Sequence, residues 1–244
     1  MRSPFLASLM VLSGMAAAGP VLAGDAAELN ILGFSTDGGI FAFEEYGIQD
    51  GSGFPYANRF YIDTAKDAFL PGSPIRVRLD DENQTLEAAR AEARKKGEAI
   101  ISEADLARNA GNTVAMNAVA ELSADPNRVV ANSSPVFARH FDPMEFRIEE
   151  FDAKPNASFC ADWPIKGFRL LSIDAKAGGT TKLLHEDKDV PASRGCALGY
   201  RIGAVQTFFP NRRPGIAVVI LAVSSVGFEG PDYRWLALPT GLPD

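Results

Sequence analysis

The sequence LNILGFS at residues 29–35 is followed by TDGG at residues 36–39 and then by IFAFEEY at residues 40–46. Both outer runs are rich in the β-branched and aromatic residues that favour strands. The Asp-Gly and Gly-Gly pairs between them tolerate the positive φ values that tight hairpin turns require. The stretch therefore predicts two antiparallel strands joined by a short turn.

Further strand-like runs extend this pattern along most of the chain. A third strand is expected at residues 59–63, after a loop rich in glycine and proline. Later runs with strand composition occupy residues 128–131, 145–151, 168–174, 181–184, 199–208, 216–223 and 235–238. The run IAVVILAV at 216–223 is far shorter than the ~20 residues that span a bilayer, so it predicts a buried strand.

One segment departs from the β pattern. Residues 83–122 are rich in Ala, Glu, Arg and Lys, with apolar residues near helical spacing. Asn83 or Thr85 is a candidate N-cap, and Gly111 marks the expected end. We predict an α+β fold, a mostly antiparallel β body with one helical insertion at about residues 83–122, forming a single globular domain over residues 24–244.

A partial propeller-like β fold is the alternative. Residues 33–43 resemble one blade hairpin of the Tol-B-like propellers, and residues 228–237 carry a weaker echo of it. A propeller would repeat this pattern every ~40–45 residues, whereas the second quarter of the chain is helical in character. The pattern therefore favours the compact α+β sheet structure.

The first 23 residues have the features of a signal peptide. They contain Arg2, a long apolar stretch and the small-x-small sequence Val21-Leu22-Ala23, which predicts cleavage after Ala23. We expect a periplasmic or secreted protein with no membrane insertion after signal cleavage. Removing Arg2 changes the net charge from -7 to -8. An acidic body argues against nucleic acid as a partner, because a phosphate backbone requires a basic patch.

The chain has two cysteines, Cys160 and Cys196. An even pair in an exported chain is expected to form a disulfide bond. The alternative is a metal or nucleophile site, but the spacing of 36 is not that of a CxxC motif and no histidine lies nearby in the sequence.

Five separated motifs carry a resemblance to a family. They are FAFEEYG at 41–47, ELSADP at 121–126, LHED at 184–187, SRGC at 193–196 and SVGFEGPD at 225–232. Together they resemble the bacterial predicted secreted proteins of domain of unknown function 2259. The resemblance implies export and carries no activity, so no functional residue is transferred from it.

Candidate site residues come from clusters of acids and histidine. His185, Glu186 and Asp187, with Asp189, have the oxygen-rich chemistry that Ca²⁺ takes, but no ligand ladder is present, and a charged loop is the expected role. We therefore predict no metal and no cofactor. Ser193 would serve as a nucleophile only if the fold brought it to His185, since no Gly-x-Ser-x-Gly motif occurs.

Glycoside chemistry would need two carboxylates facing each other across a cleft. Glu44 and Glu45, paired with Glu229 or Asp232, are the candidates, but neighbouring residues of a strand point to opposite faces. At most one of the first pair can then line a given site. The catalytic residues stay unassigned, and the site candidates are His185, Glu186, Asp187, Glu45 and Asp232.

Aromatic residues are dense between residues 41 and 61, and an exposed subset beside the loop at 51–55 would suit a carbohydrate or peptide. Because catalytic signatures are missing, the leading hypothesis is a non-enzymatic binding protein of the cell envelope. Its partner would be an envelope protein, a peptide or a carbohydrate ligand. The alternative is a periplasmic hydrolase whose site is built from loop carboxylates and His185.

Overall fold

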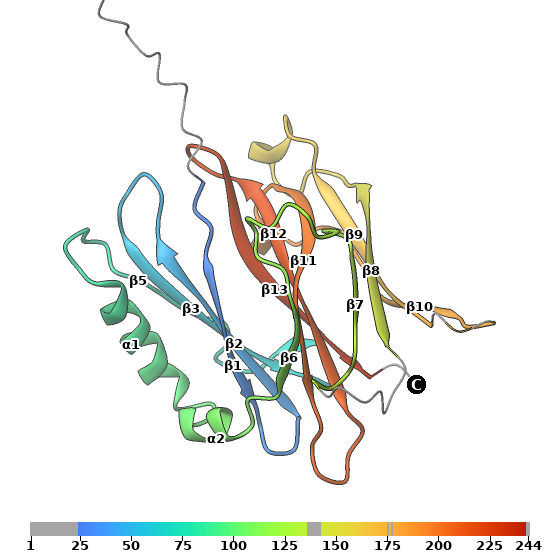
Figure 1. Cartoon of the computed structure of the whole chain (residues 1–244). Helices are drawn as coiled ribbons and strands as arrows, with labels where there is room; N and C mark the ends of the chain where they lie inside the picture. The colour runs from blue at the N-terminus through green and yellow to red at the C-terminus, as the bar shows by residue number, and fades with distance from the viewer. Residues whose placement is uncertain (1–23, 136–142, 175, 177, 243–244) are drawn as a thin grey trace, which may run out of the picture.

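A computed structural model describes residues 24–135, 143–174, 176 and 178–242. The signal peptide predicted at residues 1–23 lies outside the described residues, as does His140. Antiparallel strands dominate the described chain and form three sheets, with a short helical segment on one side (Figure 1).

The first sheet, called sheet B, holds the N-terminal strands in the order β1-β2-β3-β4, with β5 also paired to β3. Their bounds are β1 Glu28–Phe34, β2 Ile40–Ile48, β3 Pro55–Asp63, β4 Ala68–Phe69 and β5 Ile75–Arg78. The predicted hairpin is confirmed as β1 and β2. Asp37 holds its turn, because its carboxylate accepts hydrogen bonds from the Ser35 hydroxyl and the Gly39 amide.

Two further sheets use the rest of the chain. Sheet C has the order β10-β9-β8-β7, and sheet A has the order β13-β12-β11-β6. The bounds in sheet C are β7 Arg128–Ala131, β8 Met144–Asp152, β9 Lys166–Ile173 and β10 Thr181–Glu186. Those in sheet A are β6 Asn112–Met116, β11 Ala197–Phe208, β12 Ile216–Val226 and β13 Pro231–Gly241.

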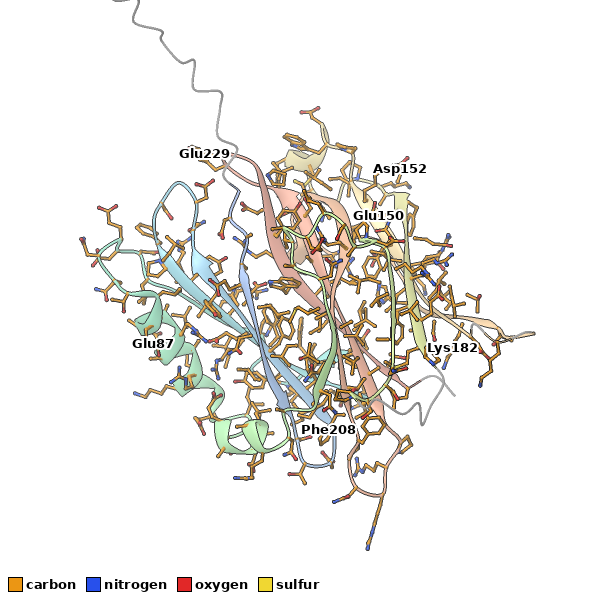
Figure 2. All side chains as sticks on the ribbon, in the orientation of Figure 1. Glu87, Glu150, Asp152, Lys182, Phe208 and Glu229 are labelled. Atoms are coloured by element: carbon orange, nitrogen blue, oxygen red, sulfur yellow. A yellow bond between two sulfur atoms is a disulfide. The ribbon has the colours of Figure 1, made fainter. Side chains whose placement is uncertain are left out.

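The elements stack in four layers, in the order helices, sheet B, sheet A and sheet C (Figure 1). Each gap between layers is filled by one apolar cluster. Phenylalanines of sheet B meet small and β-branched residues of sheet A, while sheet A meets sheet C on its other face. Figure 2 shows side chains filling the spaces between these layers. The sheets are therefore stacked and not arranged around an axis, so the propeller-like alternative does not describe the fold.

Strand β12 lies in the middle of this stack. Val218 and Ile220 pack toward sheet B, and Val219 and Leu221 pack toward sheet C. All four side chains are fully buried. A strand covered on both faces reads as a continuous apolar run and not as an alternating one. The buried strand predicted at residues 216–223 is thus confirmed.

The helical insertion is shorter than predicted. Helix α1 spans Leu86–Gly97 and helix α2 spans Glu103–Arg108. Thr85 caps α1, since its side chain accepts a hydrogen bond from the Ala88 amide. Gly97 ends α1 where it packs on Tyr61, because a Cβ at this position would lie 1.9 Å from the Tyr61 hydroxyl.

The C-terminal part of that prediction is wrong. Residues 112–116 form β6 and pair with β11, although their neighbours in the sequence are helix-forming. Strand β6 completes the edge of sheet A, and this tertiary pairing outweighs local propensity. The short strands β4 and β5 were also not predicted, because two and four residues are too few to show a periodic pattern.

The predicted disulfide is confirmed. Cys160 and Cys196 are joined, with their Cα atoms 5.3 Å apart. Cys160 ends the 3₁₀ turn η1, Ser158–Cys160, between β8 and β9, and Cys196 directly precedes β11. The bond therefore ties a connection of sheet C to the start of β11 in sheet A.

The described residues contain no helix long and apolar enough to cross a membrane.

Candidate functional site

A pocket of about 490 Å³ opens where the edge strand β13 lies between sheets B and C. Its volume falls in the range of about 300–1,000 Å³ typical of small-ligand sites. All three sheets contribute to its lining. The lining residues are Glu45, Asn58, Phe60, Ile62, Asp67, Ala68, Phe69, Arg76, His185, Pro191, Ser193, Arg194, Gly195, Val223, Ser225, Arg234, Trp235, Leu236, Ala237 and Leu238.

One wall of the pocket is apolar. Phe60 and Ile62 project from β3 toward sheet A, and Phe69 of β4 continues this wall. Trp235 and Ala237 of β13 face them from the other side. The Trp235 ring is fixed because its Nε1–H donates a hydrogen bond of 2.7 Å to the Ala27 carbonyl. A flat apolar ligand body would therefore meet rigid aromatic surfaces.

Arg194 supplies positive charge on the sheet C side. It lies in the 3₁₀ turn η2, Ala192–Arg194, and its Nη1 donates to Asp187 Oδ2 at 2.6 Å and to the Tyr200 hydroxyl at 3.2 Å. Its guanidinium also lies over the Phe168 ring, with 5.1 Å to the centroid. Only Nη1 has a hydrogen-bond partner in the part of the chain that the structure describes, so the other nitrogens remain available in the pocket.

Arg76 supplies a second cation from sheet B. It is exposed on β5, and no hydrogen bond or ion pair to it is found among the described residues. Its neighbour on the same strand face, Arg78, differs in being paired with Asp80 at 2.6 Å and in lying outside the pocket. Arg76 is thus a guanidinium with unused donors at the pocket wall.

Arg234 is the third arginine and is already engaged. It donates from Nη2 to Asp25 Oδ2 at 2.6 Å and from Nη1 to the Asp25 carbonyl at 2.8 Å. The Tyr56 hydroxyl donates to the other oxygen of the same carboxylate at 3.0 Å. Desolvation by burial raises the pKa of Asp25 despite the attraction of Arg234. This trio fastens the start of the described chain to β13.

Glu45 reaches the pocket floor from β2. Its Oε2 accepts a hydrogen bond of 2.8 Å from the Trp235 amide, and its Oε1 accepts one of 2.9 Å from Asn58. Burial raises the pKa of Glu45 above its usual value, and these hydrogen bonds only partly oppose the shift. The residue therefore links sheet B to the outer edge of β13.

The predicted candidates His185 and Asp187 lie together at the sheet C side. His185 Nε2 is 3.0 Å from Asp187 Oδ1, and the imidazole stacks on Phe168 with 5.0 Å between ring centroids. Desolvation alone would raise the pKa of Asp187, but hydrogen bonds from His185 and Arg194 outweigh it and hold the pKa below its usual range. Asp187 is therefore a buried anion that positions His185 and Arg194.

Asp67 faces this cluster from the turn before β4. Desolvation raises the pKa of its carboxyl, and the charges of His185 and Arg194 partly offset that shift. No hydrogen bond or ion pair connects Asp67 to either residue within the described ranges. Its φ of 49° is left-handed, a conformation that aspartate tolerates better than most residues. Opposite charges thus face each other at the pocket without touching.

Ser193 lines the same pocket as His185, as a nucleophile would have to. No hydrogen bond joins the two side chains in the described structure. Gly195 and Arg194 use their amides within η2, donating to Ala192 and Pro191. The fold therefore brings a hydroxyl, an imidazole and a carboxylate to one place without the contacts of an aligned triad.

The other predicted acids are placed elsewhere. Glu186 pairs with Arg169 at 2.7 Å on the exposed face of sheet C, and Asp232 Oδ1 accepts a hydrogen bond from the Asp25 amide. Neither lines the pocket. Glu229 is exposed in the loop between β12 and β13 (Figure 2). Within the described ranges, no group of three or more His, Cys, Asp or Glu residues is close enough to hold a metal ion.

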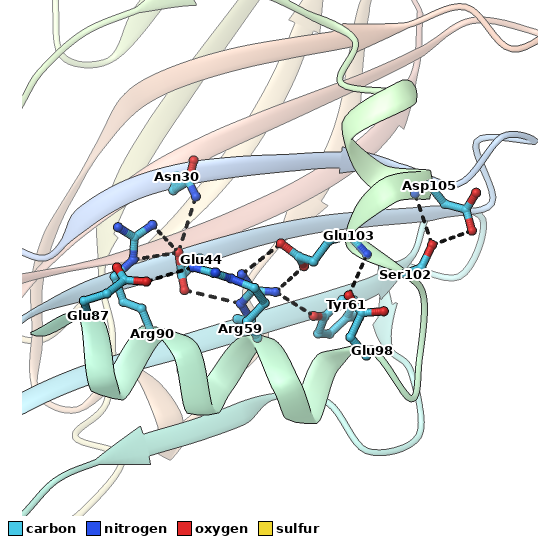
Figure 3. A network of polar contacts seen from close by, with 11 residues as sticks. Asn30, Glu44, Arg59, Tyr61, Glu87, Arg90, Glu98, Ser102, Glu103 and Asp105 are labelled. Carbon is cyan, nitrogen blue, oxygen red and sulfur yellow. Dashed lines mark hydrogen bonds and ion pairs between the residues drawn. The ribbon is translucent and has the colours of Figure 1, made fainter.

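Glu44 lies on the opposite face of sheet B from Glu45, as the alternation of a strand predicts. It is completely buried beneath α1, where Arg59 Nε is 3.3 Å away and Arg90 Nη2 is 2.8 Å away (Figure 3). Arg59 also forms a bidentate pair with Glu103 of α2. The charges of this cluster are partnered with one another, so it holds the helices on the sheet.

The aromatic residues predicted near the loop at 51–55 lie in different environments. Phe41, Phe43 and Phe60 form a stacked row in the core between sheets B and A. Phe54 lies beside Arg78, whose guanidinium is 5.9 Å from its ring centroid. Phe60 alone of these reaches the pocket.

The site residues that sequence reasoning missed are Arg76, Arg194, Asp67 and Trp235. Arg76 lies in a strand too short to be recognised, and Asp67 lies in the turn beside another such strand. The tryptophan of an apolar C-terminal strand looks like any core residue. The missed signal was an unexplained arginine in each of the segments IRVR and PASRG.

Comparison with known proteins assigns the chain to a family. The family described as predicted secreted proteins, DUF2259, matches residues 42–240, so the chain belongs to it. The resemblance given by the five motifs is thereby confirmed. No curated protein is significantly similar to the chain, and no solved structure is either.

Proposed function

We propose that this DUF2259 member is an exported binding protein whose pocket at β13 takes a ligand with an apolar body and a carboxylate. The observation that carries the proposal is the unpaired guanidinium of Arg76 opposite the partly used guanidinium of Arg194, beside the aromatic wall. Planar guanidinium groups bind carboxylates through paired N–H donors. The apolar wall supplies most of the contact area.

The carboxylates that line the pocket, Glu45 and Asp67, form no hydrogen bond or ion pair with Arg76 or Arg194 among the described residues. Glu45 has its pKa raised and both its oxygens occupied, and Asp187 is held behind Arg194. A carboxylate entering the pocket would find donors without displacing an existing ion pair. This favours binding over a purely structural role for Arg76.

The test uses fluorescence of Trp235 with sodium decanoate as the probe. The second tryptophan, Trp163, is 46% exposed and lies outside the pocket, so Trp163→Phe leaves one reporter. We expect decanoate to shift the emission saturably and decanol to bind at least tenfold more weakly. That ratio corresponds to the loss of one charged hydrogen bond, about 1.5–3 kcal/mol.

The decisive variant is Arg76→Gln, and Arg78→Gln is its matched control on the same strand. Arg76→Gln should weaken the binding of decanoate at least tenfold and leave the binding of decanol unchanged. Arg78→Gln should change the affinity for neither ligand. Equal affinities of decanoate for the two variants would contradict the proposal.

A second candidate, hydrolysis at the same pocket, is favoured by one observation: Ser193 lines it together with the hydrogen-bonded His185 and Asp187. Turnover of p-nitrophenyl butyrate that Ser193→Ala abolishes would support it. Turnover that survives Ser193→Ala, or no turnover at all, would remove this candidate and leave the binding proposal intact.

A further inference from the structure

The outer edge of β13 lines the pocket, and its backbone direction follows from two hydrogen bonds. The Tyr233 amide donates to the Asp25 carbonyl at 2.9 Å, and the Tyr233 carbonyl accepts from Ala27 at 3.0 Å. Tyr233 therefore directs both backbone groups away from β12. The ladder between β12 and β13 runs without a register shift, so Trp235, Ala237 and Pro239 direct theirs the same way.

Beyond Trp235, the next outward backbone groups of β13 have no hydrogen-bond partner among the described residues. Trp235 still donates its amide to Glu45. Ala237 is the next outward residue, and neither its amide nor its carbonyl has a partner on that side within the described residues. Ala237 is only 3% exposed and lines the pocket. A buried backbone group without a partner is costly and rare, so the amide and carbonyl of Ala237 are available to water or to a bound molecule in the pocket.

We propose that the ligand of the pocket is an extended acidic peptide that adds one strand to this edge. The inference rests on the proposed function and specifies its ligand class. The peptide backbone exchanges hydrogen bonds with Ala237 and donates one to the Trp235 carbonyl, as in other cases of strand addition. A carboxylate of the peptide meets Arg76 and Arg194, and alternate side chains contact the wall of Phe60 and Phe69.

The outer edge of β13 is recessed between two sheets. A single extended peptide therefore fits it better than the sheet edge of a second copy of this protein. Edge-to-edge pairing between two folded sheets needs an exposed edge, whereas Ala237 is buried between sheets B and C. Pro239 follows on the same side of the strand and has no N–H to offer. The pairing surface is therefore short and ends at the proline, which suits a segment of a few residues.

Charge complementarity argues for an acidic peptide. Three arginines line the pocket, Arg76, Arg194 and Arg234, and the first two have unused hydrogen-bond donors. The acid at the floor, Glu45, has a raised pKa and is fully hydrogen-bonded. The lining arginines outnumber the lining acids, Glu45 and Asp67, so a basic peptide would face an excess of positive charge.

The experiment uses the mature chain and an equimolar pool of N-acetylated, C-terminally amidated pentapeptides. Each has one Glu at the centre and β-branched or aromatic residues elsewhere. We expect the pool to slow hydrogen exchange of the Ala237 amide at least tenfold, as measured by NMR. Amides of β6, on the far edge of sheet A, serve as the internal control and should not change.

Backbone pairing is separated from pocket filling by two changes. Ala237→Pro removes the amide at a position equivalent to Pro239, and it should abolish protection by peptides while decanoate still shifts Trp235 fluorescence. If this variant does not fold, N-methylation of the tightest peptide tests the same bond in the unmodified protein. N-methylation should weaken peptide binding at least tenfold when it blocks an amide that faces β13, and should have little effect at the amides between them.

The outcomes distinguish the two proposals. If decanoate binds but no peptide protects Ala237, or if N-methylation is harmless at every amide, strand addition is overturned and the site takes small acids. If neither decanoate nor the peptide pool binds, the proposed function fails together with this inference.

Discussion

Glu44 and Glu45 are neighbours in the sequence, yet they belong to two very different ionic clusters on opposite faces of sheet B. Glu44 lies under α1 with Arg59 and Arg90, where positive and negative groups pair closely (Figure 3). Glu45 lies in the pocket, where Arg76 has no hydrogen bond or ion pair among the described residues. We call these the closed cluster and the open cluster.

The two clusters show that buried charged groups can either stabilise the fold or remain available for binding. In the closed cluster, a bidentate pair and a shared carboxylate offset the desolvation of Arg59. In the open cluster, donors on Arg194 and Arg76 remain unused beside an apolar wall. Complete partnering rigidifies a fold, whereas unused donors in a pocket can be satisfied by a ligand.

The largest expected effect is in the closed cluster. Arg59→Met should lower the free energy of unfolding by about 3–5 kcal/mol, because Glu44 would lose a buried partner. Urea unfolding measures this. The matched control, Arg94→Met, breaks an exposed pair with Glu87 and should cost no more than about 1 kcal/mol. A similar small loss for both variants would show that the closed cluster is not structural.

The second effect concerns the covalent link beside the open cluster. Replacing Cys160 and Cys196 with Ser should lower the free energy of unfolding by about 3–4 kcal/mol, as the chain-entropy model gives for a loop of 36 residues. Cys196 follows Arg194 by two residues, so decanoate affinity should fall as well. Unchanged affinity in the folded double variant would mean that packing alone positions η2.

A smaller loss is expected for Arg194→Leu. Asp187 would lose one charged hydrogen bond, worth about 1.5–3 kcal/mol, but it would keep those from His185 and the Phe168 amide. Urea unfolding should therefore show less destabilisation than for Arg59→Met. Arg213→Leu, at an exposed pair with Asp37, is the control. A loss equal to that of Arg59→Met would erase the distinction between the two clusters.

The smallest effect is one of pH. Because the pKa of Glu45 is raised on folding, the folded state binds its proton more tightly than the unfolded state does. Stability is therefore lost as pH rises from the unfolded value of about 4.3 toward the folded pKa. Glu45→Gln lacks this loss, so its stability relative to the unmodified protein should increase between pH 4 and pH 8. Parallel pH profiles in urea unfolding would contradict the raised pKa.

The strands and their faces were largely readable from the sequence. The hairpin at Asp37, the continuous apolar run of β12 and the opposite directions of Glu44 and Glu45 all follow from side-chain periodicity, which is a local property. The disulfide followed from the count of cysteines and the expected export. The helical insertion was placed correctly at its start, where Thr85 caps α1, and wrongly at its end.

The site itself depended on the tertiary structure. His185 and Glu45 were singled out and do line the pocket, but Arg76, Asp67 and Trp235 come from segments whose role depends on what packs beside them. The sequence alone determined a β-rich fold with a disulfide and its family, because periodicity, cysteine count and motifs are local. Only the stacking of three sheets decided that the edge of β13 is recessed and that Ala237 lacks a partner there, because partnering depends on residues far apart in the chain.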